Sequence, residues 1–318
     1  MDTNRRSFIR QTAITAAGLG LGLPALAKPA HSFPTPPDPS PRPVSVFSKN
    51  LHFLDYPRLA EAAARMGFDG VDLTVRPAGH VLPERVAEDL PKAVDAVRKA
   101  GLNVYMITTA IQQASEPHTE AILKTAGGLG IPYYRLGWFS YDKGKTFQQN
   151  IDTFTRQFEG LAVLNQRYRI HGDYQNHAGE SFGATALDLW MALQRIDPQW
   201  VGCQYDIRHA TVEGANSWPI GLGLLKDHIR TINFKDFRWA RKADRWKEEN
   251  CPVGEGMVDF SKYMNLLNGY GFRGPVSIHY EYALGGAENG AKQITIPETA
   301  VFEAMKKDLE KVRGMVKV

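Results

Sequence analysis

The sequence predicts one (β/α)8 barrel, and three observations lead to this fold class. Eight strand-like runs alternate strictly with helical patterns after Pro43, which implies parallel strands joined by helices. Gly or Pro interrupts most of the junctions between them. The eight units fill residues 44–318, and a closed barrel of this kind takes about 250 residues. A doubly wound open sheet is the alternative, but Ser48-Lys49-Asn50 after the first run contains no glycine-rich phosphate turn.

The expected strands are short runs rich in Val, Ile, Tyr and Phe, as buried parallel strands require. They cover residues 44–47, 70–76, 103–109, 133–137, 168–176, 201–207, 230–234 and 275–280. The expected helices repeat apolar residues at a spacing of three to four. They cover residues 57–66, 84–100, 119–129, 147–165, 184–195, 221–227 and 261–270, with a last one from 297. One charged, Trp-bearing insertion, residues 238–251, follows the seventh strand.

The N-terminus has the pattern of a cleavable export signal. Asn4-Arg5-Arg6-Ser7-Phe8 matches a twin-arginine n-region, and a small-residue apolar stretch leads to Ala25-Leu26-Ala27. That stretch covers residues 12–26 and is shorter than the roughly 20 residues a membrane helix needs. We therefore expect a signal peptide at residues 1–27, a Pro-rich linker at 28–43, and a periplasmic or secreted barrel at 44–318 with no membrane span.

Charge and cysteine content limit the partners. Without the three arginines and one aspartate of residues 1–27, the 38 basic and 34 acidic residues become 35 and 33. This near balance, without a basic run, argues against a nucleic-acid partner. Cys203 and Cys251 are expected to be unpaired thiols, although one disulfide is the alternative. Whether the chain forms a homo-oligomer stays open.

Polar side chains gather where the predicted strands end, which is where barrels of this class place their chemistry. Such groups are costly to bury without a role, so a ring of them indicates a ligand site. Aromatic side chains such as Trp138 are expected at the same end of the barrel. The polar residues are Asp72, Arg76, His80, Gln175, His177, Asp206, His209, Asn233, Lys235, His279 and Glu281. The two-residue period of a strand also places Asp206 and Arg208 on one face.

These strand ends resemble the sugar isomerase/epimerase family of xylose-isomerase-like TIM barrels. Members of that family hold a divalent metal with Glu, Asp, His and Glu from the last four strands. The corresponding positions here are Gln175, Asp206, Asn233 and His279, so three of the four differ. The strand-six motif carries over to Asp206 with His209 as a substrate-binding residue, and Asn233-Phe234-Lys235-Asp236 resembles the strand-seven motif. Residues 72–77 and 279–282 resemble a subgroup that acts on keto-sugars and glycosides.

The resemblance implies a metal site at Gln175, Asp206, Asn233 and His279, but the substitutions weaken it. A set with one negative charge should hold Mg2+ or Mn2+ weakly and would suit Zn2+ or Co2+ somewhat better. His177 or Glu281 could replace a lost ligand. Whether a metal binds is therefore open, and no nucleotide cofactor is expected.

The sequence thus predicts an exported isomerase or epimerase that abstracts a proton next to a carbonyl of an unphosphorylated sugar or keto-sugar glycoside, with metal assistance. His177, His279 or Glu281 would be the base, and Lys235 would stabilise the enolate oxygen. Arg76, His80, His209 and Trp138 would bind the sugar. A lyase or hydratase with the same enolate chemistry is one alternative. A non-catalytic carbohydrate-binding barrel is the other, because the two family glutamates are missing.

Overall fold

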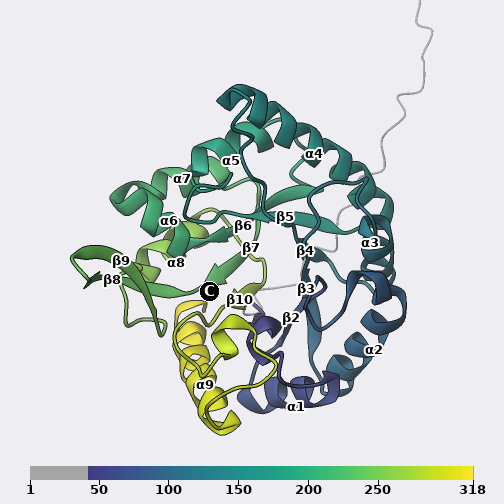
Figure 1. Cartoon of the computed structure of the whole chain (residues 1–318), viewed down its shortest axis with the longest axis vertical. Helices are drawn as coiled ribbons and strands as arrows, with labels where there is room; N and C mark the ends of the chain where they lie inside the picture. The colour runs from purple at the N-terminus through teal and green to yellow at the C-terminus, as the bar shows by residue number, and fades with distance from the viewer. Residues whose placement is uncertain (1–41, 318) are drawn as a thin grey trace, which may run out of the picture. The chain divides into compact units, whose positions relative to one another are not determined.

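The computed structural model describes residues 42–317, which form one compact unit. Eight parallel strands close into a barrel in the order β1-β10-β7-β6-β5-β4-β3-β2, with the helices around it (Figure 1). This confirms the predicted (β/α)8 barrel and excludes the open sheet. The predicted signal peptide and most of the predicted linker lie outside the described residues. The strands are β1 (Val44–Phe47), β2 (Gly70–Thr74), β3 (Asn103–Thr108), β4 (Tyr133–Arg135), β5 (His171–Gln175), β6 (Val201–Asp206), β7 (Ile229–Phe234) and β10 (Val276–Ile278).

The helices cover the outside of the barrel, and side-chain caps fix where several of them begin. Asp55 caps the first, and Thr146 forms a reciprocal capping box with Gln149 at the fourth. The α-helices are α1 (Tyr56–Met66), α2 (Val86–Lys99), α3 (Thr119–Gly128), α4 (Phe147–Tyr168), α5 (Ala186–Leu193), α6 (Ile207–Gly214), α7 (Trp218–Leu225), α8 (Phe260–Gly269) and α9 (Glu298–Met315). Short 3-10 turns are η1 (Ser48–Leu51), η2 (Pro83–Arg85), η3 (Ala215–Ser217) and η4 (Ala287–Asn289).

Two predicted strands have different bounds from those expected, and the second difference affects the site. Helix α4 continues to Tyr168, so β5 begins only at His171. Helix α6 begins directly after Asp206, whose side chain caps it by accepting from the backbone N–H of His209. The prediction that Asp206 and Arg208 share a strand face is therefore wrong, because the chain is already helical at Arg208.

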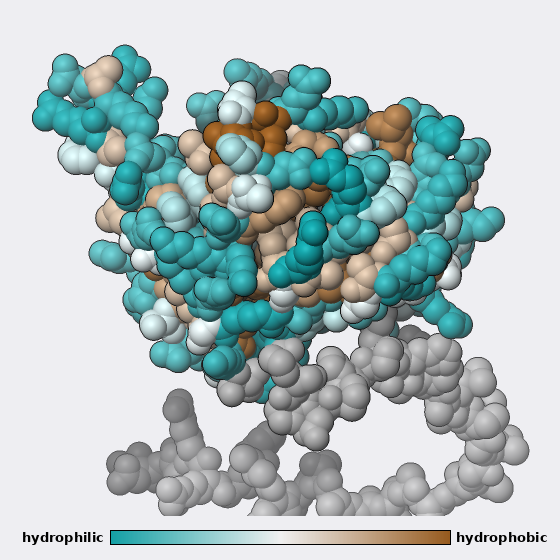
Figure 2. All heavy atoms as spheres, turned by 90° about the horizontal axis from the view of Figure 1, so that it is seen from below, coloured by the Kyte–Doolittle hydropathy of each residue, from teal (hydrophilic) through white to brown (hydrophobic). Residues whose placement is uncertain are grey.

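The insertion after the seventh strand is an antiparallel hairpin, β8 (Asp236–Lys242) and β9 (Arg245–Cys251). Ala243 and Asp244 turn it with positive φ angles of 45° and 62°, as a tight two-residue hairpin turn requires. The hairpin projects from the barrel as a largely hydrophilic lobe (Figures 1 and 2). Its base meets the barrel where the guanidinium of Arg208 donates to Asn250 Oδ1 at 2.8 Å.

The barrel fold begins before β1. Arg42, which the sequence analysis placed in the linker, is buried and donates to the carbonyls of Phe272 and Val316. Cys203 and Cys251 are both buried and free, as expected. Among residues 42–317, no helix combines the length and the apolar character needed to cross a bilayer.

Candidate active site

Asp206 lies at the centre of the polar cluster at the C-terminal ends of the strands. Its register partner on β7 is Asn233, and β5 brings Gln175 beside it. Asp206 Oδ2 accepts from Gln175 Nε2 at 2.7 Å and from Asn233 Nδ2 at 3.4 Å, and it pairs with Lys235 Nζ at 3.0 Å. All four side chains are buried. The structure thus brings together the four residues that the sequence placed at the ends of strands five, six and seven.

Lys235 connects this cluster to β10 and to a histidine. Its ammonium lies 3.0 Å from Glu281 Oε1 and 2.9 Å from His209 Nε2. With Asp206, these are three acceptors for three N–H donors, so the position of the ammonium is fixed. Burial raises the pKa of Glu281, but Lys235, His209 and Lys49 together outweigh burial and lower that pKa to about 2. Glu281 is therefore an ionised partner of Lys235.

Two histidines whose rings are in contact lie beside Lys235. The ring of His177 is 3.9 Å from that of His209 and meets the edge of Trp138 at 4.9 Å. Burial lowers the pKa of His177, and it lowers that of His209 well below the ordinary range, so both rings are neutral near pH 7. His177 Nδ1 lies 2.9 Å from the carbonyl oxygen of Ala178 and must donate to it. The neutral ring of the partly exposed His177 then carries its lone pair on Nε2.

The opposite side of the barrel mouth is lined by cations around one aromatic ring, that of Phe47. Lys49 Nζ and the guanidinium carbons of Arg76 and Arg135 lie 5.9, 5.7 and 6.0 Å from the ring centre. His279 stacks on the same ring at 4.2 Å. We call Lys49, Arg76 and Arg135 the cation trio.

His279 is a buried neutral side chain. Burial, reinforced by Lys235 and the nearby cations, lowers its pKa well below the ordinary range. Its Nε2 has no hydrogen-bond partner and lies 3.8 Å from Asp72 Oδ2. Burial raises the pKa of Asp72 to about 6, despite hydrogen bonds from Thr108 and Ser277. His279 is thus a neutral ring packed between Phe47 and Asp72.

The predicted sugar-binding residue His80 lies in a different cluster. Its ring contacts His52 at 4.8 Å, and its nitrogens lie near the Ser48 hydroxyl and the Leu54 carbonyl. Burial lowers its pKa to about 3. These contacts place His80 behind the turn η1, where it supports the loop after β1, and no interaction joins it to Asp206 or Lys235 within the described chain.

The predicted metal positions do not form a metal site. Arg135 donates to Gln175 Oε1 at 2.8 Å, so this amide turns its NH2 group, which cannot bind a cation, toward Asp206. The Lys235 ammonium already faces both carboxylates, Asp206 and Glu281. Two uncharged acceptors remain, Asn233 Oδ1 and His279 Nε2, and both lack partners. This set does not fit a divalent cation, and no group of three His, Cys, Asp or Glu side chains in residues 42–317 is arranged to hold one.

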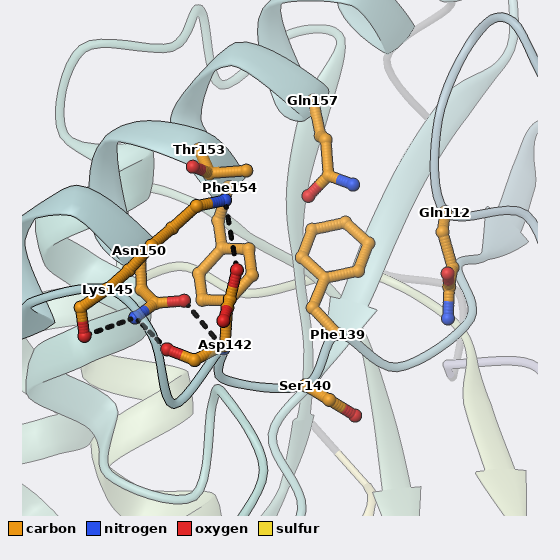
Figure 3. Close-up of a pocket in the computed structure, with 9 residues that line it drawn as sticks. All are labelled: Gln112, Phe139, Ser140, Asp142, Lys145, Asn150, Thr153, Phe154 and Gln157. Atoms are coloured by element: carbon orange, nitrogen blue, oxygen red, sulfur yellow. Dashed lines mark hydrogen bonds and ion pairs between the residues drawn. The ribbon is translucent and has the colours of Figure 1, made fainter.

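A separate hollow lies on the flank of α4 (Figure 3). Its polar side chains mostly satisfy one another: Asn150 accepts from the backbone N–H of Asp142 and donates to the Asp142 and Thr146 carbonyls. Lys145 pairs with Asp142 at 3.5 Å. These contacts shape the start of α4, and no histidine lines the hollow.

Sequence reasoning missed part of this site. Arg135 and Phe47 were not among the candidate residues. Lys49 was considered only as part of the turn after the first strand, which lacks a glycine-rich phosphate motif. The available signal was Arg135 itself, because an arginine ending the short strand Tyr133–Arg135 is as costly to bury as the polar residues that were selected. For Phe47 no signal was available, since a strand-end phenylalanine is ordinarily core.

Comparisons with known proteins agree with this architecture. Residues 60–300 match the model of a family described as "Xylose isomerase-like TIM barrel". A comparison with curated protein sequences finds no match.

Several solved structures share the fold. D-psicose 3-epimerase from Clostridium cellulolyticum H10 superposes with a TM-score of 0.65 at 13% identity, covering 87% of this chain and 100% of its own. The 3-keto-D-glucoside 4-epimerase from E. coli gives 0.64 at 13% identity, covering 85% and 99%. A xylose isomerase-like protein from Mycobacterium smegmatis in complex with magnesium gives 0.61 at 11% identity, covering 84% and 98%. At these identities the likeness establishes the fold.

Proposed function

The chain belongs to the xylose isomerase-like TIM barrel family, and from this premise we propose that it is an enzyme acting on sugars by proton abstraction next to a carbonyl. The observation that supports this most directly is the arrangement of a neutral imidazole, His177, beside a fixed ammonium, Lys235, which are linked through His209. One group can take a proton, and the other can stabilise the negative charge that this step creates.

His177 is the best base among the three candidates. Glu281 has its pKa lowered to about 2 and is held by Lys235, so it has little tendency to take a proton near pH 7. His279 is buried against Phe47 with a pKa well below its ordinary range. His177 is partly exposed, neutral, and carries its lone pair on Nε2. An abstracted proton would therefore reside on His177 Nε2.

Lys235 supplies the electrophilic side of the reaction. Asp206 and Glu281 each lie 3.0 Å from its ammonium and hold it in place. The ammonium can therefore donate a hydrogen bond to a substrate oxygen without moving. Because the predicted metal positions do not fit a divalent cation, this scheme routes no step through a metal.

The site favours a reaction with one base. Gln175 stands where the family resemblance puts a glutamate, and an amide cannot exchange a proton at neutral pH. Inversion at carbon needs proton transfer on both faces of the sugar, whereas isomerisation or elimination needs one enolising base. We therefore place isomerase and lyase or hydratase chemistry ahead of two-base epimerisation. A simple binding protein is less consistent with a buried lysine held between two carboxylates.

An unphosphorylated substrate fits the loop after β10. Barrels often bind phosphate through backbone N–H groups of the last loops. Here the backbone N–H groups of Leu284 and Gly286 both donate to Glu288 Oε2 at 2.9 Å. The carboxylate of Glu288 thus occupies the place that a phosphate would take. The substrate proposed is a free sugar or a keto-sugar glycoside.

Export is part of the proposal and rests on the sequence motif at Arg5 and Arg6. Replacing both residues with Lys should leave the full-length protein in the cytoplasm, while the unchanged protein is found outside it and begins at Lys28. Normal export of the double variant would contradict the twin-arginine assignment.

The reaction is tested by hydrogen exchange. The protein is incubated in D2O with 3-keto-glycosides and ketohexoses, and deuterium next to the carbonyl is followed by NMR. We expect incorporation by the unchanged protein and a loss of roughly 10²–10⁴-fold in His177→Gln, as for removal of a general base.

The matched control is His228→Gln, because burial lowers the pKa of His228 as it lowers that of His177. His228 precedes β7, at the opposite end of the strand from Lys235, and its replacement should leave exchange unchanged. Saturable heats of sugar binding without exchange for any compound in the panel would exclude the enzyme and leave the binding protein.

A further inference from the structure

We propose that the substrate carries a carboxylate, as a sugar acid or keto-sugar acid does, and that this group binds among Lys49, Arg76 and Arg135 beside Phe47. The inference deepens the proposed function, because the acid group would belong to the same sugar that reaches His177 and Lys235. It rests on the charges that the barrel mouth leaves without a counterion.

The cation trio has no ion pair within the described residues. Neither the guanidinium groups of Arg76 and Arg135 nor Lys49 Nζ lies within 4 Å of a carboxylate oxygen. The nearest negative charges act only from further away: Glu281 on Lys49, Asp72 on Arg76, and Asp72, Glu281 and Asp206 on Arg135. Of these, Asp206 and Glu281 are both already paired with Lys235.

Arg135 shows how costly this arrangement is without a ligand. It is 3% exposed, and its Nε has no hydrogen-bond partner. Within the described residues, its side chain makes one hydrogen bond, to the neutral amide of Gln175. Burial, followed by repulsion from Arg76, lowers its pKa to about 10. A buried guanidinium that no anion neutralises destabilises the protein. An anionic ligand that binds beside Arg135 would supply the missing negative charge.

The shape of the trio suits a small anion attached to a sugar. Two planar guanidinium groups and one ammonium lie within 6.0 Å of the centre of the same ring, and guanidinium groups match the two oxygens of a carboxylate. Phe47 offers an apolar surface for the carbon next to it. A carboxylate is favoured over a phosphate because the backbone N–H groups that could assist a phosphate after β10 already bind Glu288.

Binding, measured by calorimetry, tests the inference independently of catalysis. D-glucuronate and D-galacturonate are compared with D-glucose, D-galactose and D-glucose 6-phosphate. We expect the two hexuronates to bind at least roughly tenfold more tightly than the neutral hexoses, as one charge-assisted contact provides. Added salt should weaken the binding of the acids and leave that of the neutral sugars unchanged.

Lys49→Met and Arg76→Gln localise the site, because both side chains are only half-buried and their replacement should leave the fold intact. Each should weaken hexuronate binding roughly tenfold and leave hexose binding unchanged. The matched control is Lys226→Met, since Lys226 also lies over an aromatic ring, 5.9 Å from the centre of Tyr270, but outside the mouth. Circular dichroism confirms folding of every variant.

Equal affinity for acids and neutral sugars, or equal loss of both in Arg76→Gln, would overturn the inference. So would tighter binding of glucose 6-phosphate than of the hexuronates. If keto-sugar acids exchange deuterium equally with and without Arg76, the carboxylate site is wrong and the enzymatic reaction stands. If hexuronates bind through the trio but no substrate exchanges, the carboxylate site stands and the reaction is wrong.

Discussion

The two halves of the barrel mouth balance their charges in opposite ways. In the half formed by β5, β6, β7 and β10, Lys235 lies 3.0 Å from both Asp206 and Glu281, and every one of these charges has a partner. In the half formed around β1, β2 and β4, the trio of Lys49, Arg76 and Arg135 surrounds the uncharged ring of Phe47. The same end of the barrel therefore holds one cation that is neutralised by carboxylates and three cations that are not.

This difference separates two tasks. A donor that stabilises charge during a reaction works best when its position is fixed beforehand, and Lys235 is fixed by three acceptors. A subsite that binds a charged group gains affinity when its own charges are left unmatched until the ligand arrives. The paired half thus suits chemistry, and the unpaired half suits recognition of an anionic substituent.

The largest expected effect comes from breaking the paired half at Asp206. Asp206→Ala leaves the buried Lys235 with Glu281 alone and removes the cap of α6, so unfolding free energy should fall by about 3–5 kcal/mol. Deuterium exchange should fall by roughly 10²–10³-fold, as on loss of an oxyanion donor. Urea unfolding and the NMR exchange assay measure the two effects.

A surface ion pair provides the comparison. Lys311 pairs with Glu255 at 3.1 Å, and both side chains are partly exposed, so Glu255→Gln should cost less than about 1 kcal/mol. An Asp206→Ala protein that keeps full exchange activity would show that Lys235 is not the group that stabilises the reaction.

A smaller effect should follow from the pH dependence of Glu281. Its folded-state pKa is about 2, against an ordinary value of 4.5. A depressed pKa gives stability that is fully present above about pH 4.5 and is lost as the pH falls toward 2. Glu281→Gln should therefore be less stable than the unchanged protein by about 2–3 kcal/mol at pH 7, and this gap should shrink by roughly 1.4 kcal/mol at pH 3.5.

Urea unfolding at both pH values measures this gap. Glu248→Gln, on the exposed face of the β8–β9 hairpin, is the control. Its unfolding free energy should equal that of the unchanged protein at both pH values. A gap that stays constant between pH 7 and 3.5 would mean that Glu281 stabilises the fold by packing rather than by charge.

The sequence was sufficient for the barrel because its signal is repeated. Each of the eight alternating runs indicates the same fold. Errors at single boundaries, such as the late start of β5 at His171, therefore do not change the predicted fold. The cluster of Gln175, Asp206, Asn233 and Lys235 was predictable for a related reason: parallel strands end at one edge, so polar residues at those ends must meet.

Other parts of the site depend on details that no strand pattern contains. Asp206 caps α6, and a helix that begins one residue after a strand cannot be separated from the strand by periodicity alone. His80 was predicted to bind the sugar because its loop follows β2. Its side chain instead packs behind η1 and contacts the hydroxyl of Ser48. The orientation of the Gln175 amide is set by Arg135, a residue forty positions earlier in the chain.

The smallest expected effect is that of metal removal, and it tests whether Lys235 stands in place of a metal charge. The carboxylates of Asp206 and Glu281 already neutralise this ammonium, and Gln175 presents its NH2 group. Chelation, or addition of Mn2+, Co2+ or Zn2+, should therefore change deuterium exchange by less than about twofold. The positive control is a Gln175→Glu, Lys235→Met, His279→Glu variant, whose extra carboxylates and missing ammonium should produce Mn2+ binding that calorimetry detects. A tenfold loss of exchange on chelation, restored by one of these ions, would show that Lys235 yields its place to a metal during the reaction.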